Sequence, residues 1–362
     1  MRKSYLDNIR WATVVVVVLY HVFYCYNAEG VMGGLQRITD LEVQYYDLFV
    51  YIVYPWMMPI LYIVSGISAR HALEKYGARE FIRRRTVRLL VPSTIGPFVF
   101  NFIQGYVNMS IGGAFETMGG VPAPVKYLIM VASGISVLWY IQLLWVFSMA
   151  LVLIRKLDRG RLWALGAKAN PAFLFATVVP VWIVSHFLNT PVVVVYRFGL
   201  YGLLFLLGYF VFSHDEVIDL VKRWFPVFLP LAAGLCVAFC AVYFGKNYAD
   251  APVNCSPLFT AYCWFGCLAI LGGAARYADF QNDFTRWMGR RSFGLYVFHY
   301  LGISSVALFV GKSGRLPAAA VYLLSGVAGF AVGYLLNAVV SRIPMLRWCV
   351  LGIEKEGTHV QG

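Results

Sequence analysis

The chain alternates long apolar stretches with short polar connections along almost its whole length. A helix needs about 20 mostly apolar residues to cross the hydrocarbon core of a bilayer. Prolines inside the second and third stretches (Pro55, Pro59, Pro92 and Pro97) predict kinks there. We therefore predict an all-α integral membrane protein with about ten transmembrane helices. The expected spans are 9–27, 46–69, 88–109, 134–154, 172–189, 192–212, 225–245, 257–276, 292–311 and 317–341.

The distribution of lysine and arginine tests this count, because both residues are enriched in cytoplasmic loops. With the N-terminus in the cytoplasm, the dense basic run from Arg70 to Arg88 and most other basic residues fall on the cytoplasmic side. We therefore expect ten spans with both termini cytoplasmic, in the plasma (inner) membrane. Only six of the 30 basic residues fall on the other side: Arg37, Lys126, Arg197, Lys246, Lys312 and Arg315.

The amino-acid composition supports the membrane prediction and limits the classes of partner that we expect. Hydrophobic residues make up 60% of the chain and charged residues 13%, whereas a soluble protein carries roughly twice that charged fraction. The net charge of +13 would suggest nucleic acid or anionic lipid for a soluble protein. In a membrane protein, the enrichment of lysine and arginine in cytoplasmic loops explains most of this charge. We therefore expect the lipid bilayer as a partner and no nucleic acid. The short loops predict one transmembrane domain, 1–345, and a short cytoplasmic tail, 346–362.

The seven cysteines indicate neither a metal site nor a disulfide framework. Cys236 and Cys240 lie one helical turn apart in an apolar run, as do Cys263 and Cys267. A metal site would need histidine or carboxylate ligands beside them, and neither pair has these. We interpret both pairs as small apolar packing residues and expect no bound metal.

The first span carries the first candidate chemistry. Arg10 and His21 are eleven residues apart, which places them on one face of a helix and about 16 Å apart along its axis. Asp7 lies one turn before Arg10 on the same side, close enough to pair with it. A histidine near the middle of the bilayer needs a cavity or a partner. It is either a neutral residue that hydrogen-bonds between helices or a general base.

A second candidate is the arginine run that precedes the third span. Arg84 and Arg88 are spaced i, i+4, and Arg85 and Arg88 are spaced i, i+3. On a helix this spacing places several guanidinium groups on one face at the cytoplasmic end. Topology and lipid phosphate explain such a run, and a specific phosphate site explains it equally.

Five short patterns follow one another between residue 5 and about residue 300. They are Leu6-Asp7-x-x-Arg10 with His21 eleven residues later, Pro59 followed by Ser65-Gly66, Arg85-x-x-Arg88 with Pro92, Leu138-Trp139-Tyr140-Ile141, and Tyr296-Val297-Phe298-His299. This ordered set resembles the membrane-bound acyltransferase-3 family. The family's Trp-aromatic-Leu pattern ends here in Ile141 instead of leucine.

The resemblance implies transfer of an acyl group, usually acetyl, from cytoplasmic acyl-CoA to a sugar or another hydroxyl-bearing acceptor. His21 would be the catalytic residue and Arg10 its essential partner, while Arg85 and Arg88, with Arg84 beside them, would hold the CoA phosphates. We expect His21 to deprotonate the acceptor hydroxyl for direct attack on the thioester; an acyl-histidine relay is the alternative. Asp7 either orients Arg10 or is a helix N-terminal charge.

Five further residues are candidates for the substrate site, each with a structural alternative. Ser65 belongs to one of the family-like patterns, and His299 either lines the site or has a satisfied structural role. Trp139 and Tyr140 are acceptor contacts or interfacial aromatic residues. Arg197 lies near the external ends of two spans and could contact the acceptor.

A secondary transporter or flippase for a polar or lipid-linked substrate is the alternative function, because it also explains buried charge and interrupted helices. Against it, the sequence contains no convincing internal repeat and no acidic residue within a span of the kind that ion coupling uses. The acceptor's identity is left open by the sequence: a polysaccharide, a lipid-linked sugar or a small metabolite all fit.

Overall fold

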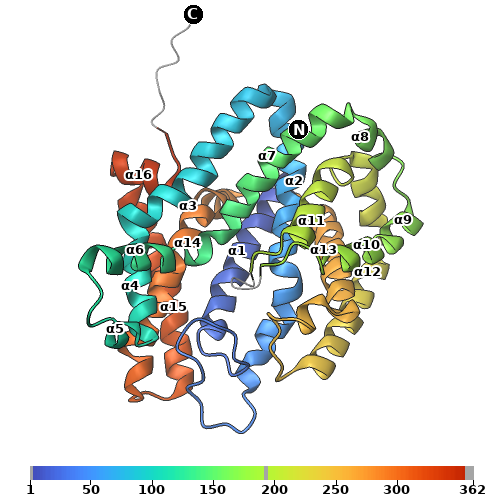
Figure 1. Cartoon of the computed structure of the whole chain (residues 1–362). Helices are drawn as coiled ribbons and strands as arrows, with labels where there is room; N and C mark the ends of the chain where they lie inside the picture. Colours follow the sequence, from blue (N-terminus) through green and yellow to red (C-terminus); the bar gives the residue numbers. More distant parts are fainter. Residues whose placement is uncertain (1–2, 191–194, 355–362) are drawn as a thin grey trace, which may run out of the picture.

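A computed structural model describes residues 3–190 and 195–354. Residues 1–2, 191–194 and 355–362 lie outside this description, and with them the start of the predicted sixth span and the end of the predicted tail. The described chain is all helical, as predicted (Figure 1). Its α-helices are α1 (Ser4–Tyr24), α2 (Leu48–Arg85), α3 (Val91–Gly96), α4 (Phe102–Ile111), α5 (Ala114–Thr117), α6 (Ala123–Ser133), α7 (Trp139–Asp158), α8 (Arg161–Gly166), α9 (Pro171–Ala176), α10 (Val178–Val184), α11 (Phe198–Phe210), α12 (Asp215–Tyr243), α13 (Pro257–Tyr277), α14 (Asp283–Phe309), α15 (Ala318–Val340) and α16 (Pro344–Leu351).

Seven helical stretches within the described ranges are long and apolar enough to cross a bilayer. The predicted fifth and sixth spans fall on shorter helices, α9 with α10 and α11. Multiple apolar helices of this length indicate a multi-pass membrane protein. The count of ten and the cytoplasmic position of both termini stay predictions. The seven stretches are Ser4–Tyr24, Tyr45–Ile111, Ser136–Asp158, Asp215–Tyr243, Pro257–Tyr277, Asp283–Ser313 and Ala318–Val340.

The predicted second and third spans are joined by helix and not by a loop. The basic segment between them continues the helix, and the break is at Gly77, with φ 71° and ψ 173°. A residue without a Cβ adopts this conformation at little cost. Figure 1 shows the chain rising through α2 and returning through α3 and α4. Pro55 and Pro59 lie inside α2, and the kinks predicted at them stay predictions, whereas the break at Gly77 was not predicted.

Two π-helical turns interrupt the returning arm, at Thr86–Leu90 and Pro97–Asn101. Pro92 lies shortly after the first of these turns, and Pro97 begins the second. A π turn widens the helix, because its hydrogen bonds skip one more residue than those of an α-helix. It therefore changes the directions in which the following side chains point. The α-helical spacing assumed for Arg84, Arg85 and Arg88 does not hold across the first of these turns.

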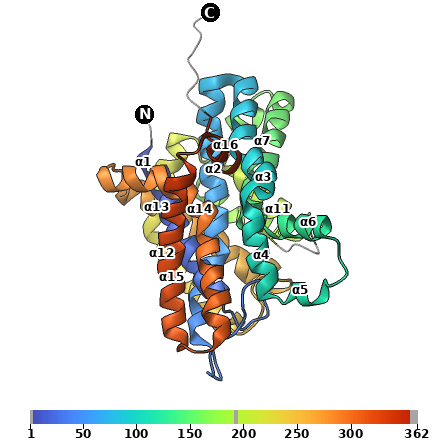
Figure 2. The same ribbon diagram turned by 90° about the vertical axis from the view of Figure 1, so that its left-hand side faces the viewer.

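The first helix lies at the centre of the molecule. It packs against α2, α13, α14 and α15, and both views show it enclosed by other helices (Figures 1 and 2). In contrast, α12 and α15 expose most of their apolar windows, as expected for lipid-facing helices. Half of the residues in the apolar window of α1 are buried, a larger share than in α12 or α15.

The segment after the last long helix folds back onto the body. Residues Pro344–Leu351 form α16, which packs against α3, and Cys349, Val350 and Leu351 are buried. This part of the predicted tail is thus a docked helix beside the first π turn.

Candidate active site

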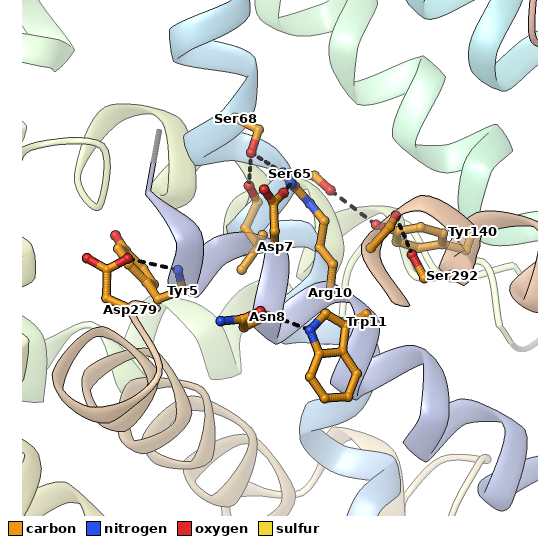
Figure 3. A network of polar contacts seen from close by, with 12 residues as sticks. Tyr5, Asp7, Asn8, Arg10, Trp11, Ser65, Ser68, Tyr140, Asp279 and Ser292 are labelled. Atoms are coloured by element: carbon orange, nitrogen blue, oxygen red, sulfur yellow. Dashed lines mark hydrogen bonds and ion pairs between the residues drawn. The ribbon is translucent and has the colours of Figure 1, made fainter. Parts of the chain in front are cut away.

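The Arg10 guanidinium ties α1 to α2. Its Nη1 donates to Asp7 Oδ1 at 2.8 Å, and its Nη2 donates to the Ser68 hydroxyl on α2 (Figure 3). Ser68 in turn donates to the Val64 carbonyl at 2.8 Å. The predicted pairing of Asp7 with Arg10 is confirmed, and the position of Arg10 relative to α2 is fixed by two hydrogen bonds in series.

The start of α1 is also anchored to the segment between α13 and α14. Asn8 Nδ2 donates to the carbonyls of Ala278, at 2.7 Å, and Phe280, at 2.9 Å. Trp11 Nε1 donates to Asn8 Oδ1 at 2.9 Å, and the Tyr5 amide donates to Asp279 (Figure 3). These bonds hold Arg10 in a defined place along α1.

Ser65 and Tyr140, both predicted at the site, lie together. The Ser65 hydroxyl is 3.1 Å from the Tyr140 hydroxyl, which joins α2 to the start of α7. Tyr140 also lies within electrostatic range of Arg10 and Arg85, and Arg85 lies within electrostatic range of Arg10. We name the group Asp7, Arg10, Ser65, Ser68, Arg85 and Tyr140 the arginine cluster.

The three arginines predicted to hold phosphate have different partners. Arg84 donates to Glu80 at 2.7 Å and stacks over Tyr76. Arg85 lies within electrostatic range of Arg10 and Tyr140 and lies over Phe81. Arg88 donates to the Leu351 carbonyl at 3.0 Å and lies over the Phe293 ring at 4.4 Å. Arg85 thus joins Arg10, Arg88 links α14 and α16 to the π turn, and Arg84 is paired on the exposed side of its own helix.

His21 is paired with His299. The Nε2 atom of His299 lies 3.2 Å from Nδ1 of His21, with ring centroids 4.9 Å apart. His21 Nδ1 is also 2.8 Å from the Val17 carbonyl, and His299 Nδ1 is 2.8 Å from the Tyr296 carbonyl. His299 is fully buried, while His21 keeps part of its surface exposed.

These contacts assign the proton on each neutral ring. A carbonyl oxygen only accepts, so the nitrogen that faces it carries the hydrogen. His299 is then protonated on Nδ1, and the single His21 Nδ1–H is shared between the Val17 carbonyl and His299 Nε2, which accepts. Within the described residues every hydrogen bond of the His21 ring uses Nδ1. Nε2 of His21 is therefore the basic nitrogen that is left to accept a proton.

A line of aromatic side chains connects the arginine cluster with the pair of His21 and His299. The Tyr140 ring lies 5.9 Å from the Tyr296 ring, which lies 6.2 Å from His299. Tyr296 is fixed by a hydrogen bond to the Val137 carbonyl at the start of the α7 segment. On the other side, Tyr20, Tyr24 and Tyr300 surround His21 at centroid distances of 5.1–5.7 Å. The histidine pair thus lies in an aromatic environment beyond the arginine cluster.

Trp139 and Arg197, the other two predicted substrate contacts, have other partners. Trp139 contacts the rings of Tyr196 and Tyr201, at 6.4 and 5.8 Å. Arg197 is buried, donates to the Asn254 carbonyl at 2.7 Å and lies over Phe259. The structure therefore brings Ser65, Tyr140 and His299 together with the predicted catalytic residues, and places Arg197 against the segment 254–259.

A family model described as an acyltransferase domain matches residues 3–338 of the chain. The chain belongs to the acyltransferase-3 family. No curated protein and no solved structure matched it. The matched range includes both the arginine cluster and the histidine pair.

Sequence reasoning missed several residues that position the site of this acyltransferase. Asn8 was visible only as a polar residue between Asp7 and Arg10, and Ser68 only as a second serine one turn after Ser65. Tyr300, which packs on His21, directly follows His299. In each case the only sign in the sequence was that the residue lies close to a predicted site residue. The residue that it contacts at the site is distant in the sequence, so the contact itself could not be predicted.

Proposed function

We propose that this membrane acyltransferase moves an acyl group, acetyl in the simplest case, from cytoplasmic acyl-CoA to a hydroxyl of a sugar or another acceptor. The observation that carries the proposal is the pairing of His21 with His299, because it leaves Nε2 of His21 as a proton acceptor. Family membership favours this function over the transporter alternative.

In the proposed mechanism His21 acts as the general base. Nε2 takes the proton of the acceptor hydroxyl while the oxygen attacks the thioester carbonyl carbon. The new C–O bond forms, the C–S bond breaks, and the CoA thiolate takes the proton back from the imidazolium. His299 Nε2 accepts from His21 Nδ1–H, which stabilises the imidazolium while it exists. In the acyl-histidine alternative, Nε2 itself would attack the carbonyl first.

The arginine cluster supports a role in holding the CoA phosphates. Arg10 and Arg85 carry like charges within electrostatic range of each other, and an anion bound between two such groups would relieve their repulsion. Guanidinium groups match phosphate oxygens in charge and geometry. The cluster lies about 16 Å before His21 along α1, a separation that the extended pantetheine arm of CoA can bridge. Arg85 is therefore the first choice, with Arg88 as a second contact.

Acyl-CoA binding and acyl transfer to an acceptor test the proposal separately. Purified protein in detergent is titrated with acetyl-CoA, and release of free CoA is followed in the presence of candidate acceptors. We expect saturable binding in wild type and in His21→Ala, with CoA release in wild type alone. His186→Ala, an exposed histidine, is the control. The absence of binding to folded wild-type protein would overturn the proposal.

A further inference from the structure

A polar cavity lies where α2, α7, α8 and α11 meet, at the same end of the molecule as the N-terminus (Figure 1). Its volume is about 370 Å³, and three of its lining residues are arginines. The family-like patterns contain none of these three. The lining residues are Arg70, Arg155, Asp158, Arg159, Gly160, Trp163, Tyr209 and Phe210.

Arg70 forms the wall of this cavity on the α2 side. Its guanidinium carbon lies 3.7 Å from the centre of the Trp163 ring, and Nη2 pairs with Glu74 at 2.5 Å. Nη1 is 3.4 Å from the Tyr209 hydroxyl. Nε is buried and has no hydrogen-bond partner among the residues that the structure describes. Arg70 is therefore held in place with one donor unused.

Trp163 cannot stack on an aromatic ligand. The His214 ring lies 3.6 Å from its centre, and His214 Nε2 is 3.0 Å from the Trp163 carbonyl. Two groups this close to one ring centre must lie on opposite faces, so Arg70 and His214 cover both. A ligand in the cavity would therefore interact mainly with its charged side chains.

The α7 end of the cavity is also positive. Asp158 accepts from the Gly160 and Leu162 amides, at 3.1 and 2.9 Å, and so caps the start of α8. Within residues 3–190 and 195–354, neither Arg155 nor Arg159 has a carboxylate within ion-pair distance. The three lining arginines thus outnumber the one lining carboxylate.

We propose that this cavity binds a phosphate group, presented either by a phospholipid headgroup or by the 3′-phosphate end of acyl-CoA. Guanidinium groups at the cytoplasmic ends of membrane helices bind both with the same chemistry. Ser68 and Arg70 are two residues apart on α2, so they point about 200° apart around its axis. The cavity therefore opens on the opposite side of α2 from Arg10 and is a separate site. The acyl-CoA source rests on the proposed function, and the phospholipid source does not.

The test uses the full chain and the double variant Arg155→Gln/Arg159→Gln. Two exposed arginines on other helices, Arg223 and Arg276, give the matched control Arg223→Gln/Arg276→Gln. Binding of phosphatidylglycerol is measured by native mass spectrometry in detergent, and binding of acetyl-CoA and of acetyl-dephospho-CoA by calorimetry. Thermal unfolding checks that each variant is folded, and the single variant Arg159→Gln serves if the double variant is not.

The two possible sources of the phosphate group, a lipid headgroup and the 3′-phosphate of acyl-CoA, predict different results. For a lipid headgroup, we expect the double variant to bind phosphatidylglycerol about tenfold more weakly than the control does, with both CoA forms unaffected. For the 3′-phosphate, wild type binds acetyl-CoA about tenfold more tightly than acetyl-dephospho-CoA, and the double variant loses that preference. Equal binding of all three ligands by the double variant and the control would overturn the proposal. Transfer activity is not part of the lipid measurement, so failure of the proposed function is seen separately.

Discussion

The Nε2 atom of His299 lies 3.2 Å from Nδ1 of His21, although 278 residues separate the two histidines. One belongs to α1 at the centre of the molecule and the other to α14, which packs beside it. The contact fixes the orientation of the His21 ring together with the Val17 carbonyl. It also makes His299 a positioning residue for the proposed base.

The first prediction concerns this pair. We expect His299→Ala to lower kcat about 10- to 100-fold with little change in KM for acyl-CoA, in line with the loss of a residue that orients a reactive histidine. His299→Gln retains a carbonyl acceptor and should recover part of the rate. Steady-state kinetics of purified protein checks this. Equal rates for His299→Ala and the His186→Ala control would remove His299 from the site.

The second prediction concerns the base itself. His21→Ala should lower acyl transfer by about 10²- to 10⁴-fold, the usual contribution of a general base, while the protein stays folded and inserted in the membrane. Transfer of labelled acetyl from acetyl-CoA, with size-exclusion chromatography as the folding check, measures this. Full activity in His21→Ala would disprove the mechanism.

The third prediction separates the arginines that the sequence grouped together. Arg85→Ala removes a charge that faces Arg10, so we expect acyl-CoA affinity to fall about tenfold or more. Arg84→Ala removes a residue that is already paired with Glu80, and its affinity should stay within about twofold. Arg83→Ala, exposed and paired with Glu80 and Glu354, is the control. The same loss in all three variants would indicate a general charge effect.

The fourth prediction is a pH dependence of stability. Glu29 lies between α1 and α2; burial and then the neighbouring Asp47 carboxyl raise its pKa to about 8. Asp47 itself accepts from Gln44 and the Ala28 amide. Between pH 4.5 and pH 8 the folded protein binds the Glu29 proton more tightly than the unfolded chain, so this residue's contribution falls as pH rises.

Glu29→Gln should therefore raise the unfolding temperature relative to wild type at pH 8 and leave it nearly unchanged at pH 5. Thermal unfolding in detergent at the two pH values measures the difference. A constant offset between the two proteins at both pH values would contradict the assignment.

The fifth prediction concerns the close contact of α2 with α11. A Cβ at Gly66 would collide with the Phe205 carbonyl oxygen, and one at Gly208 with the Ile63 carbonyl. Small residues at such positions let two membrane helices approach closely. Gly66→Ala should separate the helices beside Ser65, lowering both the unfolding temperature and the transfer rate. Gly326→Ala on α15, where a Cβ meets open space, should be neutral or slightly stabilising. A neutral Gly66→Ala would contradict this packing.

Features that depend on neighbours along the chain could be predicted from the amino-acid sequence. Apolar length predicted helices at bilayer scale, because each helix satisfies its own backbone hydrogen bonds. The i, i+3 spacing predicted the pair of Asp7 and Arg10, which the structure contains. The ordered patterns indicated the acyltransferase-3 family, which the match over residues 3–338 confirms.

Features that depend on residues far apart in the sequence became visible only in the folded protein. His299 was one candidate among several until α14 packed on α1 and brought it to His21. Arg84, Arg85 and Arg88 have different partners because a π turn changes the directions of their side chains. In addition, the carbonyl of Leu351, from α16, accepts a hydrogen bond from Arg88. Helical periodicity assumes a regular helix and says nothing about which helices become neighbours, so neither result was available from spacing alone.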